Sequence, residues 1–290
     1  MKILTIKEIL RRATDFLIEN GIDEARLDAE VLLAHVLRMR RLYLYVHLDL
    51  NLVDDDVNAY KILVHRRAAH VPVAQLTGNK EFMGLDFNIT PDVLIPRPET
   101  EIMVQLSIEM LGQIKGNITV ADIGTGSGAI AVSILHYLDN AAVDAVDVSK
   151  PALAVTRSNA EKFSVNNRLK LFEGDLTKPL VSRTYDAILS NPPYIPTDVI
   201  DELQPEVSTY EPRLALDGGK DGLKYYKRLI DGAVPLLKPD GFLALEVGVD
   251  QSDPVKQMLI SNGQFDPINV IWDLIGIERI ILAYKKCAPD

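Results

Sequence analysis

Cysteine is almost absent from this chain of 290 residues, and the single thiol is Cys287, close to the C-terminus. One thiol excludes an intramolecular disulfide and a cysteine-based zinc site, and such scarcity is typical of a protein in a reducing compartment. Positive charge is also scarce, because 31 Lys and Arg stand against 41 Asp and Glu, which gives a net charge of −10. This balance is unfavourable for a broad nucleic-acid-binding face, so we expect no direct nucleic-acid partner.

Long apolar runs are missing as well. No stretch approaches the ~18 consecutive apolar residues of a membrane span. The first residues lead into a charged amphipathic segment, which is not the pattern of a signal sequence. We therefore expect a cytoplasmic protein without membrane contact. Separately from these observations, we expect a monomer.

Histidines are few and show no metal-ligand spacing beside a carboxylate, so we expect no metal site. The five histidines are His35, His47, His65, His70 and His136.

The chain divides by pattern into three parts. Residues 1–70 show apolar positions with helical period, beginning with the capping box Thr5-Ile6-Lys7-Glu8, and are expected to form a small helical domain. Residues 71–98 change to short alternating segments followed by Pro91, Pro96 and Pro98, which is typical of a hairpin and a linker. Residues 99–290 alternate between helix and strand patterns.

That alternation predicts an α/β fold with a largely parallel sheet covered on both faces. Two β-rich runs between residues 268 and 284, with Gly276 between them, predict a closing antiparallel hairpin. The expected helices are 99–111, 127–138, 150–163, 221–237 and 251–262, and the expected strands are 118–123, 142–147, 169–172, 185–190 and 241–247.

The tetrapeptide Asn191-Pro192-Pro193-Tyr194 directly follows the expected strand 185–190. Two prolines without N–H groups must end a strand and leave a rigid rim at its carboxyl end, where open α/β sheets bind ligands. Proline has no N–H group to donate to the neighbouring carbonyls, so these carbonyl oxygens stay available. Together with the Asn191 side-chain oxygen they make this rim rich in hydrogen-bond acceptors. Such a rim suits a substrate NH2 group, although the same tetrapeptide also occurs as loop punctuation.

A glycine-rich loop follows the expected strand 118–123. Its residues Gly124-Thr125-Gly126-Ser127-Gly128 allow a sharp turn and let a ligand lie against the backbone. Asp147 ends the next strand at the spacing expected for a carboxylate that binds both hydroxyls of a ribose. The pair predicts a nucleoside site, and the Gly-x-Gly-x-x-Ala spacing by itself leaves nicotinamide cofactors open.

Two further acids favour S-adenosylmethionine. Asp122 precedes the loop, where it would repel a pyrophosphate but attract the amino group of a methionine moiety. Asp175 follows the third strand, where it can accept from an adenine amino group. Turn or cap carboxylates remain the alternative interpretation for both acids.

With these residues in place, the chain resembles the protein-(glutamine-N5) methyltransferases that modify class 1 peptide release factors, over nearly its whole length. The acceptor tetrapeptide is shared with nucleic-acid amino-methyltransferases, so other segments carry the family resemblance. They are Pro72–Gly78, Phe82–Phe87, Leu94–Glu101, Asp122–Gly128, Ser190–Ile195 and Tyr210–Gly219.

The resemblance implies a seven-stranded Rossmann-like class I methyltransferase domain, joined by a β-hairpin to an N-terminal helical bundle that recognises substrate. It implies methyl transfer from S-adenosylmethionine, with S-adenosylhomocysteine as product, to the glutamine of a Gly-Gly-Gln motif in the release factor. Some relatives have a tryptophan where this chain has Leu176, and many have an aromatic residue at Met83. Leu176 would then give adenine an apolar contact.

We expect Asn191 and Pro192 to accept the two N–H bonds of the glutamine amide, with Pro193 beside them. Tyr194 would pack on the amide plane, or else anchor the core. Arg97 and Glu246 are interpreted as scaffold. The alternative functions are an amino-methyltransferase acting on adenine N6 or guanine N2 of a nucleic acid, one acting on a ribosomal protein glutamine, and a non-catalytic nucleotide-binding or nicotinamide-dependent protein.

Overall fold

The computed structural model describes residues 4–287, which form two compact units. The first unit comprises the chain through Asn79 together with Gln204–Tyr210, and the second comprises Lys80–Leu203 and the chain from Glu211 onward. Each unit has its own core of buried apolar side chains. Within residues 4–287, no helix has both the length and the apolar character that crossing a bilayer requires.

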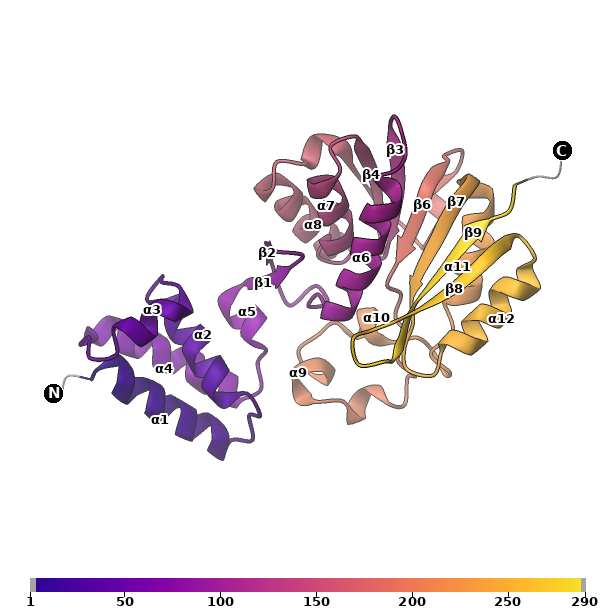
Figure 1. The fold of residues 1–290 in the computed structure, drawn as a ribbon. Coiled ribbons are helices and arrows are strands. Elements are labelled where there is room, and N and C mark those ends of the chain that lie inside the picture. The colour runs from indigo at the N-terminus through magenta and orange to yellow at the C-terminus, as the bar shows by residue number, and fades with distance from the viewer. Residues whose placement is uncertain (1–3, 288–290) are drawn as a thin grey trace. The chain divides into compact units, whose positions relative to one another are not determined.

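The first unit is a bundle of helices (Figure 1). Its first helix begins as predicted, because Thr5 Oγ1 accepts from the Glu8 backbone N–H at 3.3 Å while the Glu8 carboxylate accepts from the Thr5 N–H at 3.1 Å. Three of the helices, α1, α2 and α4, pack on one another around the apolar core. The helices are α1 (Ile6–Glu19), α2 (Ala25–Val36), α3 (Arg41–Val46), α4 (Asp54–Ala68), α5 (Val73–Thr77) and α9 (Pro205–Ser208).

The segment Gln204–Tyr210 belongs to the first unit although it lies far along the chain. The Gln75 side chain donates to the Tyr210 carbonyl at 2.8 Å, and the Tyr210 hydroxyl donates to the Ala69 carbonyl at 2.7 Å. Pattern alone places domain limits at residues 70 and 98, whereas the packing extends this unit through Asn79 and adds the distant segment. The reason is non-local, since both hydrogen bonds join residues more than 130 positions apart.

The second unit is built on a seven-stranded sheet of order β5-β4-β3-β6-β7-β9-β8. The first five of these strands are parallel to their neighbours, and β9 and β8 are antiparallel. This confirms the predicted α/β class and the closing hairpin. The strands are β3 (Ile118–Ile123), β4 (Ala141–Asp147), β5 (Leu169–Glu173), β6 (Tyr185–Ser190), β7 (Leu237–Glu246), β8 (Phe265–Trp272) and β9 (Glu278–Lys285).

Helices cover both faces of this sheet, with α6, α7 and α8 on one face and α11 and α12 on the other (Figure 1). The helices of this unit are α6 (Pro98–Leu111), α7 (Ala129–Tyr137), α8 (Lys150–Lys162), α10 (Arg213–Leu216), α11 (Tyr226–Ala233) and α12 (Ser252–Asn262). Its short 3₁₀ turns are η1 (Asn166–Arg168), η2 (Lys178–Leu180), η3 (Ile200–Glu202) and η4 (Val234–Leu236).

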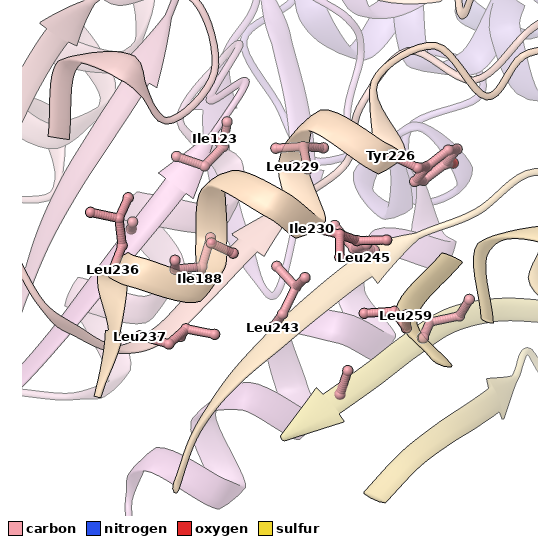
Figure 2. Close-up of a cluster of buried hydrophobic side chains, with 14 of the residues drawn as sticks. Ile123, Ile188, Tyr226, Leu229, Ile230, Leu236, Leu237, Leu243, Leu245 and Leu259 are labelled. Carbon is pink, nitrogen blue, oxygen red and sulfur yellow. The ribbon is translucent and has the colours of Figure 1, made fainter. Parts of the chain in front are cut away.

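A large part of the core lies between the sheet and the pair α11 and α12. Ile188 on β6 and Leu243 on β7 face Leu229 and Ile230 of α11 (Figure 2). Burial of each such side chain contributes about 1.5–3 kcal/mol. The central strands are therefore held firmly, and the loops at their carboxyl ends start from fixed positions.

The small hairpin of β1 (Asn79–Phe82) and β2 (Leu85–Asn88) forms where the alternating pattern predicts it. Its two turn residues, Met83 and Gly84, both have positive φ, at 52° and 70°. A two-residue turn of that kind matches the twist of the strands it joins.

The predicted helix 221–237 is wrong in its limits. The observed helix α11 is confined to Tyr226–Ala233, and β7 begins at Leu237, not at residue 241. Gly222 has φ of +72° and turns the chain before the helix, while Pro235 lies in a 3₁₀ turn that ends it. The spacing of apolar residues alone gives no sign of the turn at Gly222 or of the 3₁₀ turn at Pro235.

Candidate functional site

The site lies where the strand order of the sheet reverses. After β3 the chain adds β4 and β5 on one side, and it later returns to place β6 on the other side of β3. Ligands of open α/β sheets bind at such a switch point, beyond the carboxyl ends of the strands. Here Gly124 follows β3 and Asn191 follows β6, and a Cβ atom built on Gly124 would lie 4.0 Å from the Asn191 carbonyl oxygen.

A cavity of about 360 Å³ occupies this position. It takes residues from the ends of four neighbouring parallel strands, from the segment before α6 and from the segment around α10 and α11. The lining residues are Asp92, Val93, Leu94, Ile123, Gly124, Gly126, Val146, Asp147, Val148, Ser149, Ala152, Gly174, Asp175, Leu176, Ser190, Asn191, Pro192, Pro193, Pro212, Leu214, Ala215, Lys224, Tyr225 and Arg228.

The loop between β3 and α7 needs glycine for its conformation. Gly124, Gly126 and Gly128 all have positive φ, at 77°, 56° and 80°. Gly128 is also closely packed, because a Cβ atom there would lie 2.8 Å from Thr156 Cγ2. Gly124 and Gly126 line the cavity with bare backbone, as the sequence predicts for a ligand-binding loop.

Buried polar side chains of α8 fix this loop from behind. Thr156 Oγ1 donates to the Gly126 carbonyl at 3.0 Å, and Asn159 Nδ2 donates to the Ser127 carbonyl at 2.8 Å. Both side chains are fully buried. Sequence reasoning missed Thr156 and Asn159, because nothing in a helical pattern tells which face meets a loop thirty residues earlier.

Asp147 ends β4 at the rim of the cavity. Its carboxylate accepts from the Gly126 N–H through Oδ2 and from the Ser149 N–H through Oδ1, both at 2.9 Å. Burial raises the pKa of this carboxyl, and the backbone hydrogen bonds oppose the shift. Asp147, the residue predicted to bind the ribose, thus lines the cavity, and its carboxylate is held in one orientation by these hydrogen bonds.

Asp122 lies behind the loop and is fully buried, outside the cavity lining. Its Oδ2 accepts from the Thr125 hydroxyl at 2.7 Å and from the Ala131 N–H at 3.2 Å. Its Oδ1 is buried and has no hydrogen-bond partner among residues 4–287. Burial raises the pKa of Asp122 to about 7, so a nearby cation would favour the ionised form.

Asp175 and Leu176 lie on the opposite wall, after β5. Leu176 lines the cavity and packs against the core, with φ of +52°. Asp175 forms ion pairs through Oδ2 with Lys178, at 2.8 Å, and with Arg228. The hydrogen bond from Lys178 is the main cause that lowers the pKa of Asp175, so this carboxylate stays ionised as an acceptor.

The rim after β6 has the acceptor character that the sequence predicts. Asn191, Pro192 and Pro193 line the cavity. Asn191 Nδ2 donates to Thr100 Oγ1 at 3.1 Å, and within the described chain no donor is bonded to Asn191 Oδ1 or to the Pro192 carbonyl. These two oxygens are therefore free to accept from a ligand.

Tyr194 is placed differently from its three neighbours. It is not among the residues that line the cavity; its ring packs against the core, and its hydroxyl donates to Glu246 Oε1 at 3.4 Å. Contact of this ring with a substrate amide stays a prediction.

Comparison with known proteins bears on the whole chain. A release factor glutamine methyltransferase of Moorella thermoacetica is 43% identical over 283 residues, which cover 98% of this chain and 99% of the relative. One of Geobacter sulfurreducens is 42% identical and covers 97% of this chain and 96% of the relative. The chain belongs to the release factor glutamine methyltransferase family. Family models agree, with a PrmC N-terminal domain at residues 8–78 and a methyltransferase small domain at residues 101–203.

Solved structures show the same fold at low identity. The hMettl16 catalytic domain in complex with an RNA hairpin superposes with a TM-score of 0.59 at 19% identity, and covers 78% of this chain and 82% of that one. A 16S rRNA N2 G1207 methyltransferase of Thermus thermophilus, solved with AdoMet and guanosine, gives 0.52 at 15%, covering 72% of this chain and 50% of that one. They confirm the class I methyltransferase fold and nothing finer.

This family member also has cavity residues that sequence reasoning missed. Lys224 and Arg228 bring two cationic groups to the rim, and Tyr225 lies under the Lys224 ammonium at 5.0 Å from the ring centre. Leu214 adds an exposed apolar side chain. Lys224, Tyr225 and Arg228 fall within the expected helix 221–237, and a helical pattern alone does not tell which residues of a helix meet a cavity.

Proposed function

We propose that the protein transfers a methyl group from S-adenosylmethionine to the side-chain nitrogen N5 of the glutamine in the Gly-Gly-Gln motif of class 1 peptide release factors. One observation carries the proposal: Asn191 and Pro192, whose side-chain and backbone oxygens have no bound donor among residues 4–287, line the same cavity as the bare glycine loop. A donor of two N–H bonds can thus meet a nucleoside-bound electrophile there. Membership of the glutamine methyltransferase family selects the amide as that donor.

The residues present fit S-adenosylmethionine. Asp122 is expected from the sequence to attract the amino group, but it lies outside the cavity lining, so we assign it to support of the loop through Thr125 and Ala131 and not to direct contact with the ligand. Asp147 would hold the ribose hydroxyls, Leu176 would give the adenine an apolar face, and Asp175 would accept from its amino group. Gly124 and Gly126 leave room for the ligand, since they carry no Cβ atom.

When bound, the cofactor supplies an electrophilic methyl group and leaves as S-adenosylhomocysteine. The protein's part is orientation, because the amide nitrogen lone pair is delocalised into its carbonyl. Asn191 Oδ1 and the Pro192 carbonyl would accept the two N–H bonds and aim the nitrogen along the transfer direction. Orientation of this kind contributes about 7–11 kcal/mol and oriented acceptors about 2.7–4 kcal/mol more, without a general base. The displaced amide proton passes to water.

An amino group on a nucleic-acid base is the second candidate acceptor, because the fold is shared with enzymes that act on RNA. The net charge of −10 is against it, since such binding gains its affinity from cations that neutralise phosphates. A glutamine in a ribosomal protein is a third acceptor of the same chemistry.

The test is incorporation of labelled methyl groups into purified substrates under single-turnover conditions. We expect label in a class 1 release factor, no label in its Gly-Gly-Gln glutamine-to-asparagine variant, and none in DNA, ribosomal RNA or ribosomal proteins. Label in a nucleic acid and none in the release factor would show that the methyl acceptor is a nucleic-acid base and not a glutamine.

A further inference from the structure

Three side chains from distant parts of the second unit form one hydrogen-bonded chain behind the cavity. Asn191 Nδ2 donates to Thr100 Oγ1 at 3.1 Å, and Thr100 Oγ1 donates to Glu246 Oε2 at 2.6 Å. Asn191 follows β6, Thr100 lies in the first turn of α6, and Glu246 ends β7. Thr100 and Glu246 are buried, and neither lines the cavity.

The chain has a direction because a hydroxyl carries one hydrogen. An ionised carboxylate only accepts, so Thr100 must give its hydrogen to Glu246. The Thr100 oxygen then has only lone pairs left for Asn191, and this selects the NH2 end of the Asn191 amide. The Oδ1 end is left for the cavity.

Other groups around Glu246 keep this arrangement in place. The Tyr194 hydroxyl reaches Glu246 Oε1 at 3.4 Å, and the Tyr226 hydroxyl donates to the Glu246 carbonyl at 3.0 Å. Glu99 and Arg279 act on the carboxyl at longer range with opposite sign. Burial raises the pKa of Glu246 to about 7, against the lowering effect of the Thr100 hydrogen bond.

We propose that Thr100 and Glu246 are positioning residues, which fix the Asn191 amide so that its Oδ1, and not its NH2 group, is offered to the substrate. The role in catalysis rests on the proposed function, whereas the orientation itself is a property of the protein alone. When Glu246 is protonated, it can donate its hydrogen to Thr100 Oγ1. The Thr100 hydroxyl is then able to donate to Asn191, and the Asn191 amide can turn over so that its Oδ1 accepts from Thr100. Acidification therefore removes the acceptor that the substrate amide needs.

The decisive variant is Thr100→Val, which keeps the shape of the side chain and removes the hydroxyl. Misplacement of an orienting group costs roughly 100-fold in rate, so we expect kcat to fall by about that factor while the dissociation constant of S-adenosylmethionine stays within about threefold. Thr100→Ser should recover most of the loss. Ser107→Ala is the matched control, because Ser107 is a buried hydroxyl of the same helix that donates only to the Met103 carbonyl, at 2.7 Å.

The pH profile separates positioning from support of the fold. Because the neutral form of Glu246 dominates below its pKa, we expect wild-type kcat to rise with pH through about 7. Glu246→Gln cannot titrate and should lose that rise. An acidic limb that persists in Glu246→Gln, or Thr100→Val with wild-type kcat, would overturn the inference.

A measurement without substrate tests the orientation of the Asn191 amide separately from the proposed methyl transfer. Nuclear Overhauser contacts should link the Asn191 side-chain NH2, assigned by its loss in Asn191→Ala, to the Thr100 methyl group. If the contact is present and the wild-type protein still fails to label release factor, the proposed function is wrong and the orientation stands. If the contact is missing from a protein that labels release factor, only the inference is overturned.

Discussion

The backbone N–H of Gly126 donates to Asp147 Oδ2 at 2.9 Å, so a carboxylate at the end of β4 braces the glycine loop after β3. The same carboxylate lines the cavity. Asp147 therefore has the task of shaping the loop and, in the proposed function, that of binding the ribose. Both are lost together when the carboxylate is removed.

Asp147→Ala should weaken binding of S-adenosylmethionine by about 10- to 100-fold, the effect of losing hydrogen bonds to a charged group. Isothermal titration calorimetry gives the dissociation constant. Asp147→Asn keeps one oxygen for Gly126 and should lose less. Asp139→Ala, at an exposed position after α7, is the control. An unchanged dissociation constant in Asp147→Ala would contradict the ribose assignment.

Asn191→Ala should reduce methyl transfer to release factor by at least about 100-fold, because the acceptor that orients the substrate nitrogen is removed. Binding of the cofactor should change little, since its expected contacts come from Asp147, Leu176 and the glycine loop. Quench-flow kinetics with labelled cofactor measure the first effect and calorimetry the second. Turnover at the wild-type rate would remove Asn191 from the mechanism.

The sequence predicts this site well where the chemistry is local. Glycine permits positive φ and proline fixes its own φ, so the sequence alone predicts the loops after β3 and β6 without knowledge of the packing. The hydrogen bond between Thr100 and Glu246 could not be predicted, because the two residues are 146 positions apart and only the completed sheet brings them together. The limits of α11 were missed for a related reason, since Gly222 is packed against the backbone of Tyr194.

Gly128→Ala should destabilise the protein more than a left-handed φ alone requires. A Cβ atom there would lie 3.2 Å from the Thr156 Cα, which cannot move without shifting α8. We expect a loss of roughly 2–5 kcal/mol in the free energy of unfolding, measured with urea. Gly263→Ala is the matched control, because φ is +75° and nothing lies within 4 Å, so about 1–2 kcal/mol is expected. Equal losses in the two variants would show that contact with Thr156 is unimportant.

Arg67→Met should destabilise the helical unit by about 3–5 kcal/mol. Arg67 is buried and pairs with Asp28 at 2.7 Å and with Glu206 at 2.8 Å, and its loss leaves the buried Asp28 carboxylate without its cation. Hydrogen exchange of the α2 and α4 amides reports on this unit separately. The exposed pair Arg11 and Asp15 supplies the control, since Arg11→Met should cost about 0.3–0.5 kcal/mol.

If the cost of Arg67→Met comes from the unpaired charge, the double variant Arg67→Met with Asp28→Asn should recover part of it. Burial already raises the pKa of Asp28, and Arg67 is the group that opposes this effect. A double variant no more stable than Arg67→Met would assign the loss to packing of the arginine stem instead.

Asp122 should make the protein less stable as the pH rises towards neutrality. Burial raises its pKa from 3.8 to about 7 in the folded state, so between those values the native protein holds a proton that the unfolded chain has lost. The free energy of unfolding must then fall with increasing pH, by at most about 1.4 kcal/mol per pH unit, and level off above about pH 7. Asp122→Asn cannot titrate, so its stability should fall less steeply over this range. Urea unfolding at about pH 5, 6, 7 and 8 measures the two slopes, with Asp139→Asn as an exposed control that keeps the wild-type slope. Equal slopes in wild type and Asp122→Asn would mean that Asp122 ionises normally, and that its unpaired oxygen finds a donor.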